Sequence, residues 1–157
     1  MIKKLIFAVF LTIFLLSCEK KIKTDLHEVH WDRDMCELCK MIVSERNFAV
    51  QVVNTKNGKS YMFDDIGCAV QWFEEKNIAW SDQANIFITD ATTGKFIDAK
   101  KAFYDVNSRT PMDFGFGAYE HKNSIKDKKT ILNYEEVKLR ILRGETMQNA
   151  LIKKVNQ

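Results

Sequence analysis

The Asn57-Gly58 pair stands between two β-rich segments. Asn-Gly is a preferred central pair of a tight hairpin turn, because both positions of that turn need a positive φ. The segment before the pair, Asn47–Asn54, interleaves Val and Phe with Gln, and the return segment is Ser60–Asp64. We therefore expect an antiparallel hairpin over these residues.

A helix is expected after the hairpin, from about Ile66 to Lys76, because apolar residues recur there at helical spacing and Asp64 or Asp65 can cap it. The further expected elements are strands at Asn85–Thr89, Phe96–Ala99, Ala102–Val106 and Phe114–Ala118, and a helix at Asn133–Arg143 with Tyr134, Val137, Leu139, Ile141 and Leu142 as its buried positions. The order β-β-α-β, loosely repeated, predicts an α+β fold of two small subdomains. They span about 34–90 and 91–145, and 146–157 is expected to be a frayed tail.

The chain opens with the features of an export signal. Lys3 and Lys4 precede an apolar run, Leu5–Leu16, that is shorter than the roughly 20 residues of a membrane-spanning helix. The run ends in Leu-Leu-Ser-Cys18, which resembles the bacterial lipobox, whose Cys is lipidated and becomes the new N-terminus. An uncleaved anchor helix is the alternative. We expect residues 1–17 to be removed and Cys18, followed by a tether over 18–33, to hold the domain (34–145) on a membrane, facing the periplasm or the cell exterior.

The charge balance speaks against nucleic acid as a partner. The formal net charge is +3, and removal of residues 1–17 with Lys3 and Lys4 leaves 22 basic against 21 acidic residues. A net charge of +1 without a basic cluster provides no electrostatic footprint for a polyanion. The sequence also lacks a Ser-His-Asp arrangement, an HExxH motif and a Gly-rich phosphate loop, so we do not expect an enzyme.

Three thiols remain once Cys18 is lipidated: Cys36, Cys39 and Cys68. An odd number cannot all pair within one exported chain. The Cys36-x-x-Cys39 spacing is typical of thiol–disulfide exchange, of structural zinc and of soft-metal binding, and a plain structural disulfide is a further interpretation. Zinc would need a fourth ligand such as His30 or His121. Exchange normally places the first Cys at a helix start after a buried strand, whereas Cys36 follows a polar segment.

Methionines accompany these cysteines. Four of the six lie in or beside the segments that contain Cys36, Cys68 or the only proline, Pro111; they are Met35, Met41, Met62 and Met112. Methionine often fills gaps in a core. Combined with thiolates on an exported protein, however, thioethers select soft ions, Cu(I) above all.

Three motifs together resemble the NosL family over roughly residues 30–120. They are Cys-x-x-Cys-Lys-Met at 36–41, Phe-Asp-Asp-Ile-Gly-Cys at 63–68 and Thr-Pro-Met-x-Phe-Gly-Phe at 110–116, in this order behind the lipobox. The resemblance implies a lipoprotein that carries Cu(I) to nitrous-oxide reductase for assembly of its copper-sulfide centre. The partners would be the apo reductase or its other maturation proteins. The implied fold has two ββαβ-like units, similar to part of organomercurial lyase.

The same resemblance implies a ligand set. Cys39, two residues before Met41, would be the copper thiolate, and Met112, after Pro111, its thioether partner. Cys36 is then an added ligand or a disulfide partner, and Cys68 is a third sulfur or a small core residue; the other candidates are Met41, His30 and His121. Two alternative functions remain, a periplasmic thiol–disulfide reductase that uses Cys36 and Cys39, and a structural zinc protein.

Overall fold

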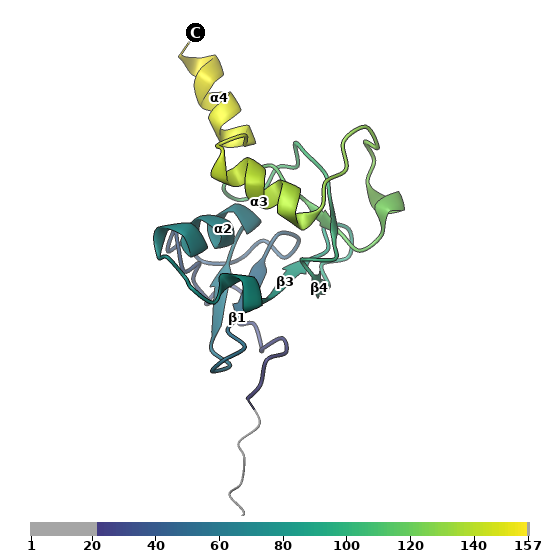
Figure 1. Cartoon of the computed structure of the whole chain (residues 1–157). Helices are drawn as coiled ribbons and strands as arrows, with labels where there is room; N and C mark the ends of the chain where they lie inside the picture. Colours follow the sequence, from purple (N-terminus) through teal and green to yellow (C-terminus); the bar gives the residue numbers. More distant parts are fainter. Residues whose placement is uncertain (1–21, 157) are drawn as a thin grey trace, which may run out of the picture.

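The expected hairpin forms one side of a four-stranded antiparallel sheet (Figure 1). The computed structural model describes residues 22–156. In it β1 (Val50–Val53) pairs with β2 (Ser60–Phe63) on one side and with β3 (Asn85–Thr89) on the other. β4 (Phe96–Asp98) adds to β3, so the spatial order is β2-β1-β3-β4 and β2 is an edge strand. A second, two-stranded sheet pairs β5 (Phe103–Tyr104) with β6 (Ala118–Tyr119).

One helix packs on the four-stranded sheet, and a second helix packs on the first. α2 (Ile66–Glu75) contacts β1 and β2, and α3 (Tyr134–Leu142) packs on α2 (Figure 1). Asp65 caps α2 by accepting a hydrogen bond from the Gly67 amide, and Asn133 caps α3 in a capping box. α4 (Met147–Val155) follows α3, and the short 3₁₀ helices η1 (Ser81–Gln83) and η2 (Lys122–Ser124) lie in connections. The α+β fold class predicted from the sequence is confirmed.

The second half of the chain differs from the expected repeat. Its order is β4, β5, β6 and then α3, and because β4 belongs to the first sheet, the chain does not divide structurally near residue 90. The strand predicted at Phe114–Ala118 is wrong for most of its length, since only Ala118 lies in a strand. Asp113 (φ 55) and Gly115 (φ 93) are in left-handed conformations that interrupt extended backbone.

Two expectations about the C-terminal helices were also wrong. Leu139 and Leu142, expected to be buried in α3, are exposed, because the stripe that faces α2 is made by Tyr134, Val137 and Ile141. The segment expected to be a frayed tail contains α4, capped by the Thr146 side chain, which accepts from the Asn149 amide. A good local cap thus starts a helix where the sequence carries only a weak apolar pattern.

Residues 22–33, within the segment expected to be a tether, pack against the sheet. The Gln51 side chain, buried in β1, accepts a hydrogen bond from the His27 amide and donates to the His27 carbonyl. Asn85 donates to the Thr24 carbonyl at 2.8 Å. The signal segment and Cys18 lie outside the described residues, and within 22–156 no helix has the length and apolar character needed to cross a membrane.

The loop of residues 110–116 packs against the first turn of α2 and is hydrogen-bonded to its N-cap residue. A Cβ atom built on Gly67 would lie only 2.0 Å from Phe114 Cγ, so the aromatic ring lies directly on the glycine. The Asp65 carboxylate, besides capping the helix, accepts a hydrogen bond from the Met112 amide at 3.4 Å. Two motifs separated by more than forty residues in the sequence therefore meet at one helix N-terminus.

Gly67→Ala tests this packing. Alanine is the better helix former, but its methyl group would overlap the Phe114 ring, so we expect a net loss of about 1–3 kcal/mol in the free energy of unfolding. Chemical denaturation of the metal-free, reduced protein measures it. Glu74→Ala, at an exposed position of the same helix, is the control and should change stability little. An unchanged or raised stability of Gly67→Ala would contradict the close packing.

Candidate metal centre

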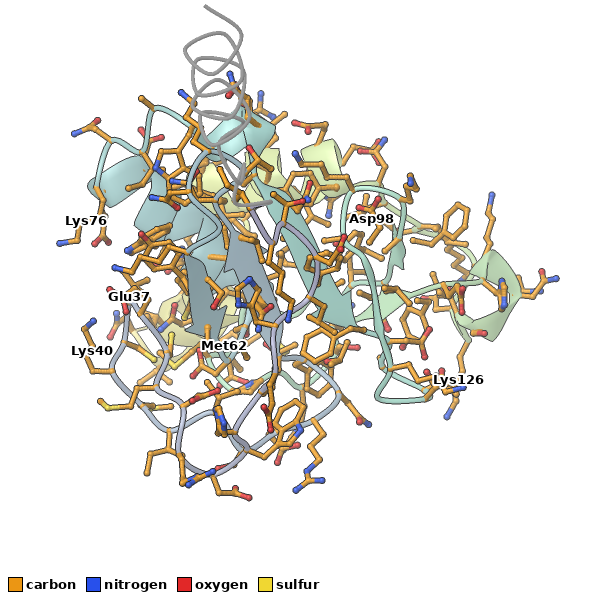
Figure 2. All side chains as sticks on the ribbon, turned by 90° about the horizontal axis from the view of Figure 1, so that it is seen from below. Glu37, Lys40, Met62, Lys76, Asp98 and Lys126 are labelled. Atoms are coloured by element: carbon orange, nitrogen blue, oxygen red, sulfur yellow. The ribbon has the colours of Figure 1, made fainter. Side chains whose placement is uncertain are left out.

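The Cys36–Met41 segment is a tight hairpin loop attached to the free edge of β2. Met35 and Ile42 form a bridge at its base, the Cys36 amide donates to the Met41 carbonyl, and Lys40 adopts a left-handed conformation with φ 62. The Glu37 amide donates to the Met62 carbonyl at 2.8 Å and so joins the loop to β2. Figure 2 shows Glu37 and Lys40 at one edge of the molecule, with sulfur atoms gathered between Lys40 and Met62.

Four possible metal-ligating side chains converge under this loop. They come from three segments: Cys36 and Cys39 from the loop, Asp64 from the residue after β2, and Cys68 from the first turn of α2. Their ligand atoms, three sulfurs and a carboxylate oxygen, all lie within 4.8 Å of one another. This is a compact set of donors for one metal ion.

The four side chains differ in their access to solvent. Cys36 and Cys68 are 0% and 1% exposed and Asp64 is 2% exposed, whereas Cys39 is only partly buried. An ion that enters the cluster therefore meets Cys39 first.

Hydrogen bonding and burial give the three free thiols different pKa values. The Cys68 thiol donates to the Cys36 sulfur, and with the backbone amides of Asp64 and Cys39 it lowers the pKa of Cys36 to about 7, against the opposing effect of burial. Burial raises the pKa of Cys39 to about 12. The pKa of Cys68 is raised because its proton is held by Cys36 and because it is buried. In the metal-free cluster Cys36 is thus the most acidic of the three thiols.

Asp64 leaves an unsatisfied acceptor in the cluster. One carboxylate oxygen, Oδ2, accepts a hydrogen bond from the Cys39 thiol at 3.4 Å. The other, Oδ1, is buried and has no hydrogen-bond partner among the described residues. A buried carboxylate oxygen without a partner is costly, and a bound cation would satisfy it. The donor set therefore fits a metal ion, and its sulfur content favours a soft or borderline one such as Cu(I) or Zn(II).

The two methionines expected to assist lie beside these segments. Met112 is half-buried. Its backbone amide donates a hydrogen bond to the carboxylate of Asp65, the residue next to Asp64. Met41 pairs across the hairpin with Cys36, its amide donates to the Cys39 sulfur, and its side chain is 46% exposed.

The two candidate histidines lie apart from the Cys–Asp cluster. His30 Nδ1 is 3.5 Å from the Asp34 carboxylate, and His121 is exposed with Nε2 3.9 Å from the Glu120 carboxylate. Neither contributes to the cluster. Asp64 is the one member not proposed as a ligand from the sequence, where it was considered only as a helix cap. Its position four residues before Cys68 and directly after a strand is the signal that would have indicated it.

Comparison with known proteins identifies a family and a similar fold. Residues 29–124 match the NosL protein family. The fold is similar to that of the crystal structure of the copper chaperone NosL from Shewanella denitrificans, with a TM-score of 0.55 and 14% sequence identity. That alignment covers 73% of this chain and 96% of the other. No curated protein matches the chain.

The pKa of Cys36 provides a test of the cluster geometry. In the reduced, metal-free protein we expect one thiol to titrate near pH 7, below the ordinary value of 9.0, so the thiolate is present above pH 7 and lost below it. The ultraviolet absorbance of the thiolate measures this. Cys36→Ser should remove the low-pH step, and Cys68→Ala, which removes the donor, should move it to higher pH. A step near pH 7 that persists in Cys36→Ser would assign it to another group.

Proposed function

This chain belongs to the NosL family, and on that basis we propose that it is an exported, lipid-anchored metallochaperone that delivers Cu(I) to nitrous-oxide reductase. The observation that carries the proposal is the buried cluster of Cys36, Cys39, Cys68 and Asp64 with its unpaired carboxylate oxygen. A carrier needs donors that bind its cargo firmly and one donor that a recipient can reach, and the cluster has both kinds.

We assign the residues as follows. Cys39, at the partly exposed side, receives and hands over the ion, and Met112 is its thioether partner. Cys36, Cys68 and Asp64 form the buried side of the site, and Met41 is an additional sulfur near the surface. Thiolate and thioether sulfurs suit Cu(I). Because Cu(I) accepts low coordination numbers, it can pass to a recipient through intermediates in which Cys39 and a partner ligand share it.

The distribution of acidity among the thiols disfavours the alternative of a thiol–disulfide reductase. Such an enzyme needs an accessible thiol with a low pKa. Here the thiol with the lowered pKa, Cys36, is fully buried, and the accessible one, Cys39, has a raised pKa. Zinc is the stronger competitor, because three sulfurs and one oxygen are four donors, the number that a structural zinc site takes.

An anaerobic Cu(I) competition titration with bathocuproine tests the proposal on reduced protein. We expect one tightly bound Cu(I) per chain, with Zn(II) unable to displace it. Cys39→Ala should abolish tight binding. Met112→Ala should weaken it about tenfold, which corresponds to about 1.4 kcal/mol for one lost ligand interaction. Asp64→Asn, which keeps the shape but removes the charge, should also weaken binding.

Met35→Leu is the matched control for Met112→Ala, since Met35 is an exposed methionine that we do not assign to the site. Its affinity should equal that of the unmodified chain. Unchanged Cu(I) affinity in both Cys39→Ala and Met112→Ala would overturn the ligand assignment. Displacement of Cu(I) by Zn(II) would favour the zinc protein. With the site established, transfer of the ion to apo nitrous-oxide reductase tests delivery.

Lipid attachment at Cys18 is tested in a bacterial host. The unmodified chain should incorporate a palmitate label and sediment with membranes, because acyl chains bring it there. Cys18→Ser should lose the label. Membrane association of the unmodified chain without a label would support the anchor-helix alternative, and a label retained in Cys18→Ser would place lipidation elsewhere.

A further inference from the structure

The first turn of α4 is hydrogen-bonded to the loop that carries Met112. The Gln148 amide donates to the Asp113 carbonyl at 2.7 Å, and the Met147 amide donates to the Phe114 carbonyl at 3.3 Å. These are N-terminal amides of a helix, which have no partner within the helix itself. The loop therefore supplies acceptors to α4, and α4 restrains the two residues that follow Met112.

The opposite side of the loop is held by α2. The Met112 amide donates to the capping carboxylate of Asp65, and the Phe114 ring lies on Gly67. On the α4 side, a Cβ built on Gly115 would lie 3.0 Å from Met147 Cβ, so the two backbones are in close contact. Met112 is thus in a loop fixed between the N-termini of two helices.

The remainder of α4 makes few buried contacts with the rest of the protein. None of its nine residues is buried, and Leu151, Ile152 and Val155 are 46%, 52% and 84% exposed. Figure 1 shows α4 projecting away from the sheet, at the end of the molecule opposite to the first described residues. An element with so few buried contacts opens at a lower free energy than the core does. Its docking therefore depends on the first turn.

We propose that α4 is a positioning element for the copper site: its docked first turn holds the 113–115 backbone so that Met112 faces the metal, and its undocking lowers copper retention. The proposal rests on the proposed function, because it needs Met112 as a ligand. The physical reason is pre-organisation. A thioether on a fixed loop loses less conformational entropy on binding the ion than one on a free loop.

Met147→Pro, compared with Met147→Ala, removes one restraint while leaving the helix intact. Proline lacks the amide hydrogen that bonds to Phe114, and the first helical position is where helices accept proline best. The preceding residue, Thr146, already has the extended backbone that proline requires before it, with φ −120 and ψ 160. Alanine removes the same side chain but keeps the amide. We expect the proline variant to bind Cu(I) about twofold to tenfold more weakly than the alanine variant, the effect of one hydrogen bond.

A second pair of variants tests the first turn of α4 through its N-cap residue. The Thr146 side chain caps α4 by accepting a hydrogen bond from the Asn149 amide at 3.3 Å. Thr146→Ala removes this cap and should fray the first turn, which lowers Cu(I) affinity in the same direction as Met147→Pro. Thr146→Ser keeps a hydroxyl in the capping position and should restore the affinity.

A double-mutant cycle with Met112→Ala separates positioning from a general loss of structure. If α4 acts through Met112, Met147→Pro and Met147→Ala should bind Cu(I) equally in the Met112→Ala background. An equal loss in both backgrounds, or equal affinities of Met147→Pro and Met147→Ala in the otherwise unmodified chain, would overturn the positioning role while leaving the proposed function standing. If the unmodified chain binds no Cu(I), the proposed function fails and the positioning role falls with it.

Discussion

Two adjacent buried carboxylates, Asp64 and Asp65, hold together the parts of the molecule on which the site depends. Burial raises the pKa of Asp65 to about 6, and its remaining charge is stabilised by hydrogen bonds from Thr110 and from the Gly67 and Met112 amides. Those bonds start α2 and attach the 110–116 loop to it. Asp64 faces the thiols instead and retains one oxygen without a partner among the described residues. Hydrogen bonds within the protein offset the cost of burying the Asp65 carboxylate, whereas the unpaired oxygen of Asp64 would need a bound cation for the same purpose.

The consequence is a site made at a junction of segments. β2 is an edge strand, so its free side can receive the hairpin loop of Cys36 and Cys39, while its end leads directly through Asp64 into α2 and Cys68. The buried thiols, Cys36 and Cys68, lie inside this junction. Around it lie the partly exposed Cys39 and the loop of Met112, which α2 and the first turn of α4 hold in place. Buried donors beside one accessible donor suit a protein that must bind an ion and also give it up.

The sequence was most informative where the interactions are local. The β1–β2 hairpin, the cap and length of α2 and the bounds of β3 follow from turn residues, a capping aspartate and apolar spacing within a few positions. The sequence was least informative where the local structure depends on contacts between residues that are far apart in the chain. The residues from Phe114 to Gly117 look like a strand, yet the loop must turn to place Phe114 on Gly67. α4 was missed because its apolar pattern is weak and because, besides the local Thr146 cap, its first turn is stabilised by carbonyls of that distant loop.

The donors themselves were evident from the sequence: thiols and thioethers in three motifs whose order and spacing resemble one family and whose chemistry favours a soft ion. Which of these donors lie together was decided by the tertiary structure. It joins Cys68 to Cys36 and Cys39, adds Asp64, leaves His30 and His121 outside the cluster, and gives each thiol its own acidity. The physical reason is that ligand type is a property of the side chain alone, whereas proximity, burial and pKa depend on which distant backbone segments pack against each other.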